Sequence, residues 1–131
     1  MALIKGTHHV ALRVTPEKFP TAMAFYTQTL QLPVLRTWND GKCAMLSTGN
    51  SIIELLTTPE ALPENGMFQH LALATDHVDE IIGIVRDMGL TVTVEPKDVV
   101  LGANPGLKAR IAFFIAPTGE TVELFCEQGL V

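Results

Sequence analysis

The feature that most constrains the fold is an internal repeat. The segment HVALRV at positions 9–14 is similar to HLALAT at 70–75, and SIIELL at 51–56 is similar to ETVELF at 120–125. All four segments are rich in aliphatic and β-branched residues and are bordered by turn residues, which indicates strands. Because self-similarity constrains a fold more strongly than local propensity does, the chain is predicted to form two similar modules.

Each half is predicted to contain a strand, a helix and three further strands. The first half has expected strands at about 7–14, 33–38, 42–48 and 51–57, with a helix at 17–30. The second half has expected strands at 68–75, 91–95, 109–115 and 120–127, with a helix at 77–88. We therefore expect one domain, with module one at about 5–58, a linker rich in Pro, Glu, Asn and Gly at 59–67, and module two at 68–128.

The segment PKDVVLGANPGLK at 96–108 separates two predicted strands of the second half. It contains two prolines and two glycines, which favour a loop over a strand. Long loops often carry functional residues, so the segment is predicted to be a substrate lid.

Four residues inside the repeated strands carry the most specific chemical signal. A carboxylate between Ile53 and Leu55 is out of place in a buried strand, because burying an uncompensated charge is costly. A divalent metal would compensate two histidines and two glutamates together, since both residue types are common metal ligands. The candidate ligands are His9, Glu54, His70 and Glu123.

The alternation of side chains along a strand tests this hypothesis independently. His9 is expected to face the same side as Ala11, and His70 the same side as Ala72, so that small side chains leave room for a cleft. His8 is expected to point to the opposite face as a partly exposed residue near the end of its strand.

Composition excludes several other classes of protein. The 131-residue chain has a net charge of -5 and scattered Lys and Arg residues, which argues against nucleic acid as a partner. No apolar run approaches the roughly 20 residues of a membrane helix, and MALIKGTHH lacks the apolar core of a signal peptide. Cys43 and Cys126 show no metal-binding or redox spacing, so free thiols and a cytoplasmic location are expected.

The quoted residues resemble the vicinal oxygen chelate superfamily, which includes glyoxalase I. The resemblance covers nearly the whole chain and rests on HHVALRV, AFYTQTLQLPVLRTW, IIEL, QHLALAT and TGETVELFCE. It implies an α+β fold in which two βαβββ modules curl their sheets around a metal-containing cleft. In glyoxalase-type members the two modules at one cleft can belong to different subunits, so the resemblance implies a homodimer and leaves open whether the cleft lies within one chain.

The resemblance also implies a reaction. One divalent ion (Zn, Ni, Co, Mn or Fe) would be held by the four candidate ligands and would polarise a carbonyl group. A carboxylate beside it would take a proton from the neighbouring carbon; Glu123 is the first choice of base and Glu54 the second. The expected function is that of a glyoxalase-like lyase or isomerase acting on a small α-oxygenated carbonyl compound through an enediolate.

Other branches of the superfamily leave alternatives open. Related epimerases of acyl thioesters carry an amide in place of Glu54, several Fe-dependent dioxygenases use two histidines and one glutamate, and some antibiotic-binding relatives use no metal. The presence of Glu54 favours the glyoxalase-like branch. The turn at 116–119 departs from the family's usual acidic turn, and the segment between the modules is short; both differences concern the substrate rather than the ligands.

Three further residues are candidates for binding the substrate. Arg13 and Arg110 are suited either to an anionic group of the substrate or to a carboxylate of the protein. Trp38 is expected either to line the pocket or to pack in the core. The chain has no P-loop, dinucleotide fingerprint or nucleophile elbow, so the common nucleotide-binding and serine-hydrolase classes are not indicated.

Overall fold

The computed structural model describes residues 2–29, 31–58, 68–117 and 120–131. The order of strand, helix and three strands occurs twice, as the repeat predicted. The first set comprises β1 (Gly6–Val14), α1 (Phe19–Ala24) with the π-helix η1 (Phe25–Thr29), β2 (Val34–Trp38), β3 (Cys43–Ser47) and β4 (Ile52–Thr57). The second set comprises β5 (Phe68–Ala74), α2 (Val78–Asp87), β6 (Val92–Leu101), β7 (Leu107–Ile115) and β8 (Thr121–Leu130).

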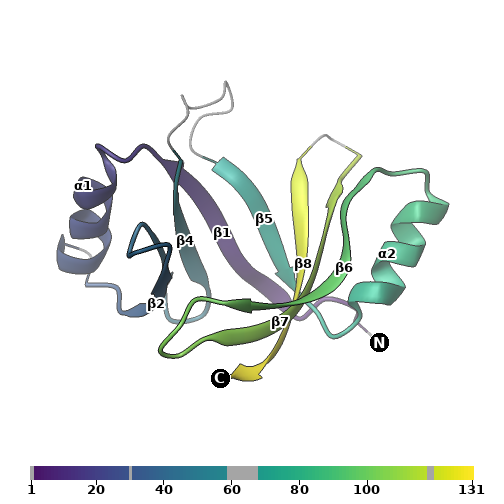
Figure 1. Ribbon diagram of the computed structural model, residues 1–131. Coiled ribbons are helices and arrows are strands. Elements are labelled where there is room, and N and C mark those ends of the chain that lie inside the picture. The colour runs from purple at the N-terminus through teal and green to yellow at the C-terminus, as the bar shows by residue number, and fades with distance from the viewer. Residues whose placement is uncertain (1, 30, 59–67, 118–119) are drawn as a thin grey trace.

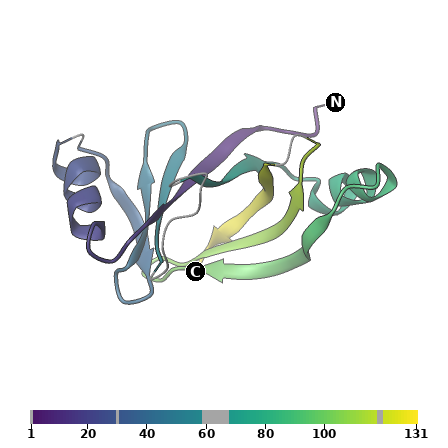
Figure 2. The same cartoon turned by 90° about the horizontal axis from the view of Figure 1, so that it is seen from above.

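The strands form one curled sheet in the order β2-β3-β4-β1-β5-β8-β7-β6. The first and last strands of each set are parallel neighbours, and the two sets join through the antiparallel pair β1 and β5. Figures 1 and 2 show α1 and α2 at opposite ends of the sheet, both outside its concave side. The expected α+β fold of two βαβββ modules is confirmed.

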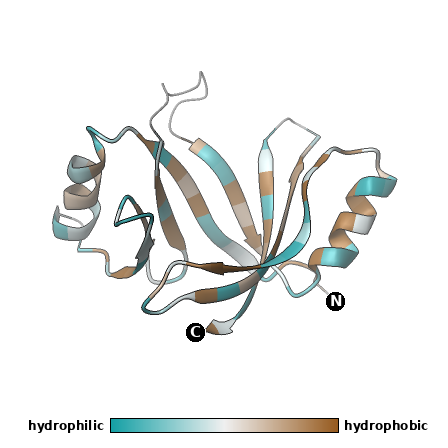
Figure 3. Cartoon of the chain, viewed as in Figure 1, coloured by the Kyte–Doolittle hydropathy of each residue, from teal (hydrophilic) through white to brown (hydrophobic). Residues whose placement is uncertain are grey.

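The alternation of side chains gives the sheet one packed face and one face that is available for a site. In the second module, Leu124 and Val122 pack against Ile82 and Val85 of α2. In the first module, Leu55 and its neighbours pack against residues of α1 and η1. Figure 3 shows the resulting alternation of hydrophobic and hydrophilic residues along the strands. Because the apolar positions face the helices, the intervening positions line the concave side.

The first helix is shorter and less regular than the pattern predicted. It begins at Phe19, with Pro20 in its first turn where the missing N–H needs no partner, and continues as a π-helix from Phe25 to Thr29. The Thr27 hydroxyl donates to the Met23 carbonyl at 2.6 Å, a side-chain bond of the kind that bends helices.

The predicted lid at 96–108 is wrong. Most of this segment is strand, because β6 extends to Leu101 and β7 begins at Leu107. Pro96 is tolerated because β6 is the edge strand of the sheet, where a missing N–H costs little, and the register shifts between Val94 and Lys97. The segment is therefore a hairpin rather than a loop over the cleft. The predicted linker at 59–67 lies outside the described residues.

The tip of the β6–β7 hairpin reaches the opposite edge of the sheet. Thr37 of β2 forms an isolated antiparallel bridge with Ala103, next to Gly102. The two ends of the curled sheet therefore meet within one chain, as Figure 1 shows where the hairpin passes below β2.

Gly102→Ala is expected to destabilise the fold by about 1–2 kcal/mol, because Gly102 has a φ of +68° that disfavours side chains. An added Cβ would also lie 3.2 Å from Arg36 Cδ and 3.3 Å from the Thr37 carbonyl oxygen. Gly83→Ala in α2 is the matched control, since nothing lies within 4 Å and Ala favours a helix by up to about 1 kcal/mol. Urea unfolding of both variants should move the midpoints in opposite directions; equal midpoints would contradict the closure.

Candidate metal centre

The register of the central strands places the four candidate ligands around two alanines. Ala11 of β1 lies opposite both Glu54 of β4 and His70 of β5 in the sheet register. Ala72 of β5 lies opposite both His9 of β1 and Glu123 of β8. The two halves thus contribute the same pattern, and the small alanine side chains, both fully buried, leave space for the four polar groups.

The polar atoms converge within a few ångströms. The Nε2 atoms of His9 and His70 are 3.1 Å apart. Glu123 Oε1 lies 2.9 Å from His9 Nε2 and 3.0 Å from His70 Nε2. Glu54 Oε1 stands further away, at 3.5 Å and 3.7 Å from the same two nitrogens. In this structure all four candidate ligands lie in one chain.

Burial and hydrogen bonding together give the two carboxylates different acidities. Burial raises the pKa of Glu54 to about 7, and the negative charge of Glu123 adds to this effect while His70 opposes it. Burial also favours the neutral form of Glu123, but hydrogen bonds from His70 and His9 outweigh it and lower the pKa of Glu123. Glu123 is therefore the more acidic of the two carboxylates.

This donor set fits a divalent metal ion. The ligand atoms of His9, His70 and Glu123 all lie within 4.8 Å of one another, and each residue is at most 5% exposed. A histidine binds a metal through an unprotonated ring nitrogen, so a bound ion would take the place of any hydrogen on the two Nε2 atoms. Imidazole nitrogen and carboxylate oxygen together suit Zn, Ni, Co, Mn or Fe.

The prediction for His8 is wrong. This residue is 8% exposed, and its Nδ1 lies 2.8 Å from His9 Nδ1. Between Thr7 and His9 the register of β1 against β5 shifts, so that His8 is an extra residue in β1. Such a bulge breaks the two-residue side-chain period, which explains why alternation failed here.

The substrate-binding candidates lie in three different environments. Arg13 Nη2 donates to the Phe68 carbonyl at 3.1 Å. Trp38 is half-buried at the end of β2, opposite Cys43. Arg110 Nε donates to Asp79 Oδ2 of α2 at 2.7 Å, which places its guanidinium on the helix-covered side of the sheet and not with the four candidate ligands. Substrate contacts of these residues stay predictions.

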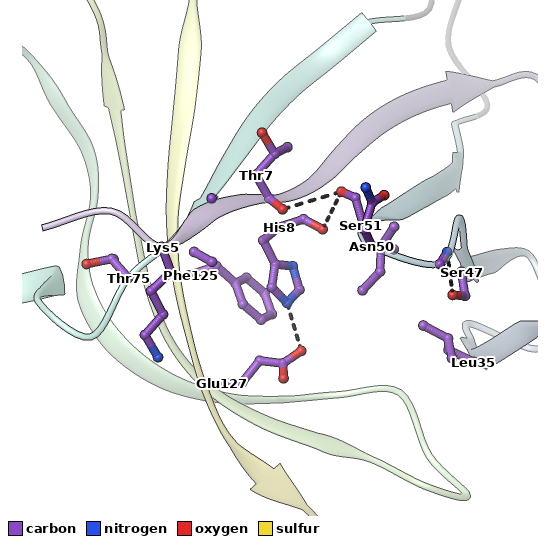
Figure 4. A pocket seen from close by; sticks show the side chains of 14 residues that line it. Lys5, Thr7, His8, Leu35, Ser47, Asn50, Ser51, Thr75, Phe125 and Glu127 are labelled. Carbon is purple, nitrogen blue, oxygen red and sulfur yellow. Dashed lines mark hydrogen bonds and ion pairs between the residues drawn. The ribbon is translucent and has the colours of Figure 1, made fainter. Parts of the chain in front are cut away.

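A cavity of about 490 Å³ opens beside the cluster. Figure 4 shows His8, Phe125 and Glu127 on one side of it and Ser47, Asn50 and Ser51 on the other. The four candidate ligands do not line this cavity, and His8 stands between the cavity and His9. The side chain of His8 therefore connects the cavity to the cluster.

Comparison with protein families shows which superfamily the chain belongs to. Residues 6–124 match the model of the Glyoxalase/Bleomycin resistance protein/Dioxygenase superfamily. The chain belongs to this superfamily, as the resemblance of its strand motifs predicted. No curated protein matches the chain.

Solved structures with the same fold include two methylmalonyl-CoA epimerases. The Mycobacterium tuberculosis enzyme is 21% identical with a TM-score of 0.71, and the match covers 98% of this chain and 92% of that one. A Streptomyces coelicolor variant in complex with 2-nitronate-propionyl-CoA is 24% identical with a TM-score of 0.72, covering 96% and 99%. A hypothetical protein from Bacillus halodurans is 22% identical with a TM-score of 0.70, covering 94% of each chain.

Two predictions that concern the whole chain can also be compared with the structure. Cys43 and Cys126 are both free, as expected. Among the described residues, no helix has the length and apolar character needed to cross a membrane. The cytoplasmic location and the homodimer stay predictions.

Proposed function

We propose that the protein is a metal-dependent lyase or isomerase of the glyoxalase type, acting on a small α-oxygenated carbonyl compound. The observation that carries the proposal is the convergence of His9, Glu54, His70 and Glu123 in one buried cluster on the concave side of the sheet. A divalent ion held by these side chains would act as a Lewis acid that polarises the substrate's carbonyl group.

The chain's own residues would supply orientation and proton transfer. The imidazoles of His9 and His70 fix one side of the cluster, and Glu123 bridges them through one carboxylate oxygen. Glu123 remains the first candidate for the base that removes the proton next to the carbonyl, by the family resemblance and by its contacts with both imidazoles; its lowered pKa keeps it ionised but makes it a weak base. Glu54 is the second candidate for the base, and it lies further than Glu123 from both imidazoles. Burial of all four groups excludes bulk water from the transfer.

Epimerisation of an acyl thioester is the second candidate function. It is favoured by the similarity to the two methylmalonyl-CoA epimerase structures, although identities of 21% and 24% support the fold alone. Both reactions begin with removal of a proton next to a carbonyl, so the same base and the same ligands serve either one. The presence of Glu54 favours the lyase function over the epimerase function, because the related epimerases of this family carry an amide at this position.

Metal analysis of the purified protein is the first test. After reconstitution with Zn²⁺, Ni²⁺ or Co²⁺, we expect about one ion per chain for the wild type, and a loss of that ion in His9→Ala and His70→Ala because each removes a nitrogen ligand. His77→Ala is the matched control, since His77 precedes α2 and pairs with Glu80 rather than with the cluster. A wild type that takes up no metal would refute the proposal and favour a binding protein.

Activity assays of the loaded protein then distinguish the candidates. Conversion of the hemithioacetal of glutathione and methylglyoxal to a thioester is expected for the lyase. Solvent-deuterium incorporation into methylmalonyl-CoA without lyase turnover would favour the epimerase. Oxygen consumption with Fe²⁺ bound would contradict both and favour a dioxygenase.

A further inference from the structure

The strongest feature that the proposed reaction does not use is a chain of polar contacts leading away from His9. His9 Nδ1 lies 2.8 Å from His8 Nδ1, and His8 Nε2 lies 2.8 Å from Glu127 Oε1. His8 is buried, whereas Glu127 is about half exposed on the cavity side. Figure 4 shows the His8 ring between the strand backbone and the Glu127 carboxylate.

The tautomers of both histidines follow from these contacts. A histidine that ligates through Nε2 keeps its proton on Nδ1 and needs an acceptor there. The partner of His9 Nδ1 is His8 Nδ1, which accepts only if His8 carries its proton on Nε2. That proton then points at Glu127 Oε1, and a carboxylate is an acceptor at neutral pH. With His9 protonated at Nδ1 and His8 protonated at Nε2, each N–H between His9, His8 and Glu127 therefore meets an acceptor.

The fold holds the His8 ring in the place that this arrangement requires. The bulge at His8 turns the side chain toward His9, and Ser51 Oγ donates to the His8 carbonyl at 3.1 Å. The ring stacks on Phe125, with centroids 3.9 Å apart and an angle of 25° between the planes. Phe125 is 1% exposed, so the surface that supports the ring is itself fixed.

We propose that His8 and Glu127 are positioning residues that fix the tautomer and orientation of His9 for metal binding. The inference rests on the proposed metal centre and adds two residues that do not contact the ion. Outer partners of this kind typically contribute 10–100-fold to metal affinity, because they orient the ligand and raise its basicity.

The test compares variants at His8 by competition of Zn²⁺ with a chelator. His8→Phe keeps a ring that can stack on Phe125 but removes the acceptor, and it is expected to weaken Zn²⁺ binding about 10–100-fold. His8→Gln restores an acceptor oxygen and is expected to recover affinity to within about fivefold of the wild type, because the hydrogen bond and not the ring is what His9 needs. If His8→Phe binds Zn²⁺ as tightly as the wild type, the inference is overturned.

Variants at Glu127 test the outer half of the chain without touching the core. Glu127→Ala is expected to weaken Zn²⁺ binding about 3–10-fold, below the full range for a direct partner. Gln128→Ala, at the next and exposed position of β8, should leave affinity unchanged. Equal affinities of Glu127→Ala and Gln128→Ala would remove Glu127 from the proposal.

Nitrogen-15 NMR of the histidine side chains gives a readout that does not depend on activity. In the Zn²⁺-loaded wild type, we expect His9 protonated at Nδ1 and His8 protonated at Nε2. A His8 proton on Nδ1 would overturn the inference while leaving metal uptake, and so the proposed function, intact. A wild type that binds no Zn²⁺ would overturn both, so the two failures are distinguishable.

Discussion

Replacing Glu123 by Gln is expected to lower turnover by about 100-fold or more and to weaken metal binding. The carboxylate contacts both imidazoles at 2.9 and 3.0 Å, so the change removes the anionic candidate ligand that bridges them. If Glu123 is also the base, the loss of proton transfer alone corresponds to about 10²–10⁴-fold. Steady-state kinetics on whichever substrate is turned over, together with metal content, measure the two effects.

Two further variants make this result specific. Glu54→Gln is expected to retain more metal than Glu123→Gln, because Glu54 stands further from both imidazoles, at 3.5 and 3.7 Å. Glu95→Gln removes a carboxylate that pairs with Arg86 on the surface, and it should leave both readouts unchanged. Unchanged metal content and unchanged turnover in Glu123→Gln would contradict the proposed roles of Glu123 as a metal ligand and as the base.

The repeat made the fold and the central cluster predictable. Each half repeats a strand with a histidine and a strand with a glutamate, and the parallel pairs β1–β4 and β5–β8 place these residues at equivalent positions. The pairing of β1 with β5 then joins the halves, so that His9 and His70 meet. The register between β1 and β5 could not be predicted from the sequence of either half alone, because it depends on how two distant strands associate.

The errors at His8 and at 96–108 have local physical causes. Alternation assumes one residue per step of the ladder, and the bulge at His8 adds one. The sequence did carry a signal, since Glu127 shares a face of β8 with Glu123 and can reach an adjacent histidine. Pro96 suggested a loop because the edge position of β6, which tolerates a proline, is a property of the assembled sheet.

The environment of Arg110 shows a different limit of sequence reasoning. Its guanidinium pairs with Asp79, 31 positions earlier, and with Asp98 on the neighbouring strand. An arginine beside an apolar strand is equally compatible with a substrate's anionic group or with a carboxylate of the protein. The contact forms only because α2 packs on the helix-covered face of β7 and brings Asp79 to Arg110. No motif in either segment predicts that contact.

Replacing Ile82 by Ala is expected to destabilise the protein by about 2–5 kcal/mol. Ile82 is 2% exposed and packs with Ala112, Val122 and Leu124 beneath α2, so its truncation leaves a cavity in the core of the second module. For a chain of this length the loss corresponds to a melting temperature lower by roughly 7–18 °C. Thermal unfolding followed by circular dichroism measures the shift.

Ile84→Ala is the matched control for this effect, because the same residue type on the same helix is 44% exposed. Both changes improve helix propensity equally, so the difference between them isolates burial; Ile84→Ala is expected to cost about 1 kcal/mol or less. At low temperature Ile82→Ala should still bind one metal ion per folded chain, because Ile82 packs on the helix-covered face and the cluster lies on the other. Equal melting temperatures for the two variants would mean that α2 does not form the core of this module.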